Sequence, residues 1–178
     1  MASSTASRPH ARFTVAEFHR LCELLPERRL ELIDGEVLEM IAKGSRHTAV
    51  VHRLARTLTP LLVACGYELR IGPPLDLGEH QEPEPDLAVV TARADAWLEA
   101  HPSAAAALLV IEVADASLAY DLDTKLRLYQ QDGIANYWVV DVREPMAFFL
   151  LQGKTEQPLL TAMREQVEAL VAELRALG

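Results

Sequence analysis

Hydrophobic positions follow two periods along this chain. Apolar residues recur every three or four positions in several stretches, which predicts amphipathic helices. These helices are expected over residues 14–23, about 45–65, 94–100, about 121–131 and 156–177. Thr14 and Glu17 have the spacing of a capping box at the start of the first helix. Pro60 predicts a kink or an early end in the second helix, and Gly66 fits its C-terminal stop.

Short apolar runs lie between these helices and predict β-strands. They fall at residues 29–40, 67–71, 86–90, 108–113, 136–142 and 146–151. Asp34-Gly35 divides the first run and is a strong signal for a two-residue hairpin turn. The last run is expected to be the hairpin or edge partner of the strand before it. This order of elements predicts an α/β fold with a mixed central β-sheet flanked by helices, followed by a C-terminal amphipathic helix.

The 178 residues are enough for one domain with a substantial core, and half of them are hydrophobic. We expect a disordered leader over residues 1–12, a domain over 13–151 and a helical extension over 152–178. The leader lacks the apolar centre of a secretory signal, and no apolar run reaches the roughly 18 residues of a membrane span. Cys22 and Cys65 have neither metal-site nor disulfide spacing, so a reduced, cytoplasmic protein is expected.

The formal net charge of −9 narrows the class of function. Proteins that hold nucleic acid through phosphate contacts alone are usually basic, so this acidity counts against a simple DNA-binding module. It counts less against an enzyme whose carboxylates hold a divalent cation, because the metal supplies positive charge locally.

One ionisable residue interrupts the most apolar of the predicted strands. Leu108 to Val113 is hydrophobic except for Glu112, which lies near the carboxyl end of the run. A lone carboxylate costs several kcal/mol to bury unless a cation or hydrogen-bond donors compensate it. A salt bridge or backbone donors are one explanation for this acid. A metal ligand is the other, since open α/β sheets place their sites at the carboxyl ends of strands.

Two further acids and a lysine bear on that choice. Glu31 and Asp86 also lie on predicted strands among apolar neighbours, and Lys125 lies on the helix after Glu112. Taken singly, each is more often a solvent-exposed or ion-paired side chain. Together they supply what phosphodiester hydrolysis needs, namely hard oxygen ligands for Mg²⁺ and an ammonium group that positions water and offsets negative charge.

Several sequence blocks occur in an order and spacing that match a known family. They are Glu31-Leu-Ile-Asp-Gly35, His47, Glu84-Pro-Asp86, Val110-Ile-Glu-Val-Ala-Asp-Ala-Ser117, Tyr120-Asp121, Lys125, Tyr129, Gly133 and Tyr137-Trp-Val-Val-Asp141. Over roughly residues 13–149 the chain resembles the Uma-type family of restriction endonucleases, which is similar to the broader PD-(D/E)xK nuclease superfamily. The resemblance implies a restriction-endonuclease-like fold and metal-dependent hydrolysis of DNA phosphodiester bonds. Mg²⁺ is the expected cofactor, with Mn²⁺ able to substitute.

The resemblance also implies roles for individual residues. Asp86 and Glu112 match the two metal-binding carboxylates, and the backbone carbonyl of Val113 matches a further ligand. The superfamily usually places its lysine two residues after the glutamate, but Ala114 occupies that position here. The Uma-type pattern takes the lysine from the following helix, which points to Lys125.

Other matched positions have less definite roles. Glu31 matches an auxiliary acid that contributes to metal binding directly or through water. His47 matches a position at the start of the second helix, where it either contacts a substrate phosphate or is an exposed or helix-capping side chain. Asp121 is expected to orient Lys125 or to cap its helix, and Tyr129 is expected in the hydrophobic core.

Three functional hypotheses remain open from the sequence. The first is a metal-dependent endonuclease with nucleic acid as its partner; DNA is the expected substrate, and RNA stays open. The second is an inactive nuclease-like fold that acts as a binding or assembly module, because the chain is acidic and shows no base-reading motif. The third is a scaffold in which Glu112 and Lys125 simply form a buried ion pair.

The C-terminal helix has two possible arrangements: it either packs on the domain or pairs with a second copy. A homodimer is expected, because nucleases that cut both strands commonly act as dimers.

Overall fold

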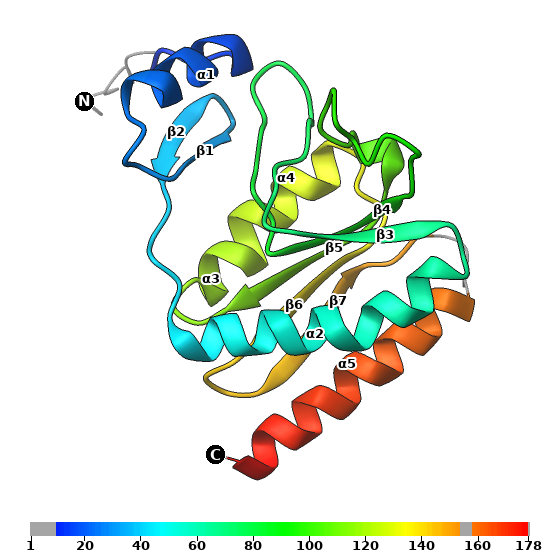
Figure 1. The fold of residues 1–178 in the computed structure, drawn as a ribbon. Helices are drawn as coiled ribbons and strands as arrows, with labels where there is room; N and C mark the ends of the chain where they lie inside the picture. The colour runs from blue at the N-terminus through cyan, green and yellow to red at the C-terminus, as the bar shows by residue number, and fades with distance from the viewer. Residues whose placement is uncertain (1–9, 154–157, 178) are drawn as a thin grey trace, which may run out of the picture.

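The computed structural model describes residues 10–153 and 158–177 (Figure 1). Most of the predicted leader, residues 1–9, lies outside the described residues. The elements in chain order are α1 (Val15–Leu24), β1 (Leu30–Ile33), β2 (Glu36–Glu39), α2 (Ser45–Val63), β3 (Tyr67–Ile71), β4 (Leu87–Thr91), η1 (Ala104–Ala106), β5 (Ala107–Ala114), α3 (Leu118–Tyr120), η2 (Asp121–Lys125), α4 (Leu126–Gln131), β6 (Tyr137–Asp141), β7 (Met146–Leu151) and α5 (Pro158–Leu177). Within these described ranges, no helix is long and apolar enough to cross a membrane.

The described residues form a five-stranded sheet and a separate two-stranded hairpin. The strand order of the larger sheet is β3-β4-β5-β6-β7. Strands β5 and β6 run parallel, and the other neighbouring pairs are antiparallel. The sheet is therefore mixed, as the hydrophobic pattern predicted. The helical segment α3-η2-α4 makes the crossover that a parallel pair requires.

Strand β5 lies at the centre of the sheet and is buried on both faces. Leu109, Ile111 and Val113 belong to a core shared with α2 and α5, which lie together on one face of the sheet (Figure 1). Val110 and Ala114 belong to a second core shared with α4. Because side chains alternate along a strand, Glu112 shares the face of this second core. The acid is thus directed toward the crossover helices and away from α2 and α5.

The C-terminal helix α5 packs on its own domain. Its apolar stripe is buried against α2 and the sheet through Met163, Val167, Leu170, Val171 and Leu174. Arg53 of α2 also pairs with Glu173 of α5. Of the two arrangements open from the sequence, the structure shows the helix packed within the chain.

Residues 13–39 form a small unit beside the main sheet, which we call the hairpin unit (Figure 1). It consists of α1, capped by the expected Thr14–Glu17 capping box, and the β1–β2 hairpin. The backbone of Leu32 exchanges two hydrogen bonds, of 2.9 and 3.3 Å, with Glu82 in the segment before β4. This contact brings strand β1 to the segment that leads into the central sheet.

The prediction of a helix over residues 94–100 was wrong. The segment forms turns in which Ala96 and Trp97 have positive φ angles of 49° and 59°, a conformation that non-glycine residues rarely adopt. The Trp97 indole donates a hydrogen bond of 3.1 Å to the carbonyl of Thr91, and the Arg93 guanidinium lies 4.5 Å from the ring centroid. Contacts with the end of β4 therefore hold the turn.

The helix predicted after β5 is longer and less regular than the sequence indicated. It begins at Leu118 and contains a π-helical turn, η2, at Asp121–Lys125. Turns of this kind are rare and are often found at functional sites. Asp121 and Lys125, the two ends of the turn, are both buried.

Candidate active site

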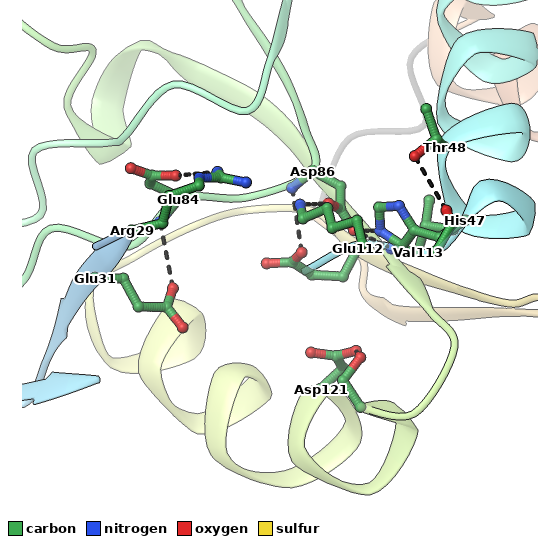
Figure 2. Close-up of polar contacts among 12 residues, drawn as sticks. Arg29, Glu31, His47, Thr48, Glu84, Asp86, Glu112, Val113 and Asp121 are labelled. Atoms are coloured by element: carbon green, nitrogen blue, oxygen red, sulfur yellow. Dashed lines mark hydrogen bonds and ion pairs between the residues drawn. The ribbon is translucent and has the colours of Figure 1, made fainter. Parts of the chain in front are cut away.

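At one end of the β4–β5 pair, hydrogen bonds between backbone amides and carboxylate side chains replace the backbone pairing. Their register runs to Leu87 opposite Ile111. Beyond that point, the amide of Asp86 donates to Oε2 of Glu112 at 3.2 Å, and the amide of Val113 donates to Oδ2 of Asp86 at 2.8 Å (Figure 2). Because buried backbone amides need acceptors, these two bonds fix both carboxylates at the ends of the strands.

Asp86 is buried and is held by two basic side chains. Its Oδ2 accepts a hydrogen bond from Nε2 of His47 at 2.9 Å, and its Oδ1 contacts the ammonium group of Lys43. Burial raises the pKa of Asp86, but the hydrogen bond from His47 and the charge of Lys43 outweigh burial and lower the pKa to about 2. Asp86 is therefore ionised at neutral pH.

Glu112 is buried more deeply and responds in the opposite direction. Its Oε1 accepts hydrogen bonds from Nζ of Lys125 at 2.9 Å and from the hydroxyl of Tyr129 at 3.0 Å. Burial raises the pKa of Glu112 to about 7, with the charge of Asp86 adding to the rise and Lys125 opposing it. Two neighbouring carboxyl groups thus have well separated pKa values.

Lys125 comes from the π turn and not from a strand. Its Nζ lies 2.9 Å from Oε1 of Glu112 and 3.3 Å from Oε2 of Glu31. Burial lowers the pKa of Lys125, but the charges of these two acids outweigh burial and raise the pKa above its ordinary value. Ala114, two residues after Glu112, lies in the hydrophobic core.

Glu31 brings the hairpin unit into the site. It is buried, and its Oε2 accepts a hydrogen bond from the amide of Glu84 at 3.4 Å in addition to its contact with Lys125. Arg29 pairs with the Glu84 carboxylate at 2.7 Å (Figure 2). Lys125 therefore bridges an acid of the hairpin unit and an acid of the central sheet.

Asp121 faces the same region from the π turn (Figure 2). Its Oδ2 accepts a hydrogen bond from Oγ of Ser117 at 2.6 Å, and burial raises its pKa. The hydroxyl of Tyr120 is buried and has no hydrogen-bond partner within the described part of the chain. Burial and the charge of Glu31 raise the pKa of Tyr120 to about 12.

The charged side chains of the site do not balance. Among the described residues, the acids of the site are Glu31, Asp86, Glu112 and Asp121, and its ammonium groups are those of Lys43 and Lys125. With all four acids ionised, they outnumber the two ammonium groups by two charges, so the site has room for added positive charge. Within the described ranges, no three His, Cys, Asp or Glu side chains form a metal-binding cluster. Two carboxylates, the carbonyl of Val113 and water are nevertheless the hard oxygen donors that Mg²⁺ takes, so the residues fit this ion.

The structure brings the residues singled out in the sequence into one cluster. They are Glu31, His47, Asp86, Glu112, Val113 and Lys125. His47 is buried on Asp86 and is neither exposed nor the N-cap of α2, which is Gly44. Sequence reasoning missed Lys43, although it lies just before His47, and it gave Tyr129 a place in the core without its hydrogen bond to Glu112.

The fold is shared with a protein of known structure. A crystal structure of "a putative nuclease belonging to DUF820 from Anabaena variabilis ATCC 29413" is similar, with a TM-score of 0.65 at 14% sequence identity. The similarity covers 91% of this chain and 99% of that chain. The five-stranded mixed sheet with flanking helices and a C-terminal helix is therefore the restriction-endonuclease-like fold that the sequence blocks implied.

A family model described as "Uma2: Putative restriction endonuclease" matches residues 15–175. Because the match covers most of the 178 residues, the chain belongs to this family of nucleases of the restriction-endonuclease type. The match confirms the resemblance and extends it through α5. No curated protein sequence matches the chain.

Proposed function

We propose that this protein is a divalent-metal-dependent endonuclease that hydrolyses DNA phosphodiester bonds, with Mg²⁺ as cofactor and Mn²⁺ as a substitute. The observation that carries the proposal is the meeting of Asp86, Glu112 and Lys125 at one end of the β4–β5 pair. Hydrolysis of a phosphodiester needs oxygen ligands for a metal and a fixed positive charge beside them. This end of the sheet supplies both.

Asp86, Glu112 and the backbone carbonyl of Val113 would hold the cation. The chemistry that a divalent ion would supply there is polarisation of a phosphoryl oxygen and a lowered pKa of a bound water molecule. The amide of Val113 and the ring of His47 orient Asp86, while the amide of Asp86 and the hydroxyl of Tyr129 orient Glu112. Both carboxylates are thus held in place by groups outside the metal site, which is the support that such ligands need.

Lys125 supplies the positive charge. It stays protonated between Glu112 and Glu31, whose charges raise its pKa against the effect of burial. Its Nζ can donate to a phosphate oxygen, which offsets the negative charge that develops there, and can orient the attacking water. Glu31 is then a positioning residue that holds the ammonium group of Lys125 in line with Glu112.

His47 is proposed to position Asp86. Its Nε2 is already engaged with Oδ2 of Asp86 at 2.9 Å. A contact with substrate would have to come from Nδ1, which has no hydrogen-bond partner within the described residues. Asp121 accepts its hydrogen bond from Ser117 and not from Lys125. Its proposed role is to add negative charge around Lys125.

Cleavage of plasmid DNA with Mg²⁺ or Mn²⁺ tests the proposal. The wild type is expected to cut, and Asp86→Ala and Lys125→Ala are expected to lose about 10²-fold or more of the rate, the usual effect of removing a group that stabilises developing charge. Arg127→Ala is a matched control, because Arg127 follows Lys125 by two residues but is exposed and pairs with Asp123. A wild type that cuts nothing, or variants that cut at its rate, would contradict the proposal.

A binding or assembly module without turnover is the second candidate, and one observation favours it. The carboxylates already have protein partners, since Lys43 and His47 contact Asp86 and Lys125 contacts Glu112. A scaffold held together by buried ion pairs would have the same contacts. Calorimetric titration with Mn²⁺ separates the two candidates. A nuclease binds Mn²⁺ and is weakened by Glu112→Gln, whereas a module binds none or is indifferent to the change.

We further propose that the protein acts as a homodimer in a reducing, cytoplasmic setting. One site cuts one strand, so a second copy related by twofold symmetry supplies the second cut. Cys22 and Cys65 are free thiols, as expected of a reducing compartment. Light scattering of the full chain, alone and with a DNA duplex, tests the assembly, and a monomer under both conditions would contradict it.

A further inference from the structure

Lys43 lies in the linker between β2 and α2, residues 40–44, which joins the hairpin unit to the main domain (Figure 1). Its side chain is 27% exposed and reaches inward to Oδ1 of Asp86. Ile41 in the same linker is 85% exposed, so this part of the chain is not packed into a core. Lys43 is therefore a partly exposed cation that reaches a buried acid from a solvent-exposed segment.

The two lysines of the site differ in how firmly they are held. Lys125 sits on a helical turn, is 7% exposed and lies within 3.3 Å of two acids, Glu31 and Glu112. Lys43 contacts Asp86 alone and comes from the exposed linker. An ammonium group on a flexible four-carbon stem is readily hydrated, so Lys43 can leave its acid at a smaller cost than Lys125.

Asp86 has one oxygen that a cation can take. Its Oδ2 accepts hydrogen bonds from His47 and from the amide of Val113, at 2.9 and 2.8 Å. Its Oδ1 is the oxygen that Lys43 contacts. A divalent ion at Oδ1 and the ammonium group of Lys43 would compete for the same lone pairs and repel each other, so binding of the ion displaces Lys43.

The surroundings of Lys43 suit an anion once it is displaced. Residues 40–46 contain Lys43 and Arg46 and no acid, in a chain whose net charge is −9. Asp115 lies beside Gly44, but it is paired with Arg143 at 2.7 Å. Lys43 and Arg46 can therefore present two positive charges to a nucleic-acid backbone next to Asp86.

We propose that Lys43 is an exchangeable phosphate-binding residue: it occupies Asp86 in the metal-free protein and moves to a DNA phosphate when a divalent cation takes its place. The exchange couples metal binding to DNA binding, because each cation that enters releases an ammonium group for the substrate. This inference rests on the proposed nuclease function. It identifies Lys43 as the residue that couples binding of the metal cofactor to binding of the DNA substrate.

Calorimetric titration with Mn²⁺ in the absence of DNA gives the first test. Lys43→Met removes the competing cation and is expected to bind Mn²⁺ about tenfold more tightly than wild type, the scale of one hydrogen bond to a charged group. Arg46→Met removes a charge from the same segment without freeing Asp86, and it is expected to bind Mn²⁺ as wild type does. Lys43→Arg keeps a positive charge that competes for Asp86, so it is expected to bind Mn²⁺ with the affinity of wild type. A purely structural Lys43 would give equal or weaker binding in Lys43→Met, and that result would overturn the inference.

Binding of a labelled DNA duplex, measured by fluorescence anisotropy with Ca²⁺ and with EDTA, gives the second test. Wild type is expected to bind the duplex more tightly with Ca²⁺, and Lys43→Met to lose most of that gain. The slope of log affinity against log salt should also fall by about one in Lys43→Met, as expected for one lost phosphate contact. A Ca²⁺ response in Lys43→Met equal to that of wild type would overturn the inference.

The failure of this inference can be told apart from failure of the nuclease proposal. A wild type that neither cuts DNA nor binds Mn²⁺ overturns both. A wild type that cuts and binds Mn²⁺, beside a Lys43→Met variant with no gain in Mn²⁺ affinity, overturns the exchange alone. Circular dichroism melting shows whether each variant is folded, and Lys43→Gln, which also removes the positive charge, gives the same readouts if Lys43→Met does not fold.

Discussion

Ile111 and Glu112 are neighbours on β5, yet they face two different environments. Ile111 points to the core under α2 and α5, where the contacts are apolar. Glu112 points toward the crossover helices and meets Lys125 and Tyr129. One strand thus separates a face with apolar contacts alone from a face on which a second hydrophobic core surrounds buried charge.

The difference between the two faces shows where stability and chemistry come from. Apolar burial under α2 and α5 contributes free energy of folding roughly in proportion to area. A buried ion pair contributes little net stability, because the desolvation of both charges offsets their attraction. Apolar burial therefore offsets the desolvation of the buried charges. We infer that these charged groups serve chemistry and contribute little to stability.

The largest expected effect comes from removing the cation of the charged face. Lys125→Met leaves Glu112 and Glu31 buried without their shared partner, which should lower the free energy of unfolding by about 4 kcal/mol. The double variant Lys125→Met, Glu112→Gln removes one of the stranded charges and should regain part of that loss without regaining cleavage. Urea unfolding at pH 8 measures both. Equal stability of Lys125→Met and wild type would show that the ion pair does not support the fold.

A smaller effect is expected from pH, and it has a definite sign. The pKa of Glu112 is about 7 in the folded protein against 4.5 for an ordinary glutamate, so between these values the folded protein binds the extra proton. The stability of the metal-free protein should therefore fall as pH rises from 4.5 to 7, by at most about 3 kcal/mol.

Urea unfolding in EDTA at several pH values measures this slope, with Glu112→Gln as the comparison. The variant should show a flatter profile across the same range. Asp86 does not contribute there, because its pKa is lowered to about 2 and its stabilising effect is lost only as pH falls below the ordinary value of 3.8. Parallel profiles for wild type and Glu112→Gln would contradict the prediction.

The smallest effect is expected from a change on the packed face. Ile111→Val deletes one methyl group from a fully buried side chain and should cost about 1 kcal/mol of stability. Because Ile111 faces away from the carboxylates, Mn²⁺ affinity and the rate of plasmid cleavage should stay at wild-type values. Calorimetry and cleavage assays check this, and a change in either would mean that the two faces are coupled through the strand.

Sequence signals that act over a few residues predicted much of the fold. The Thr14–Glu17 box placed the start of α1, and the short apolar runs placed the strands that the structure contains. Asp86 and Glu112 could be found because each is an acid at the end of an apolar strand. Signals of this kind involve residues that are close together in the sequence, so they can be seen without the structure.

Contacts between distant residues explain what the sequence did not show. Lys43 reaches Asp86 across 43 positions, and the linker that carries it has no periodic pattern. The positive φ angles at Ala96 and Trp97 follow from contacts with the end of β4, while the local composition favours a helix. The π turn at Asp121–Lys125 changes the helix by a single residue, and hydrophobic periodicity does not resolve so small a change.

That π turn has a consequence for how this site tolerates insertions and deletions. A π turn closes over one residue more than an α turn, so removing one residue from Asp121–Lys125 could restore a regular helix. The helix after the turn would keep its orientation, but residues within the turn would shift by one position, which is about 100° around the helix axis. Because the lysine is on this turn, while Asp86 and Glu112 are on strands, one codon lost here would separate the ammonium group from two carboxylates that had not moved.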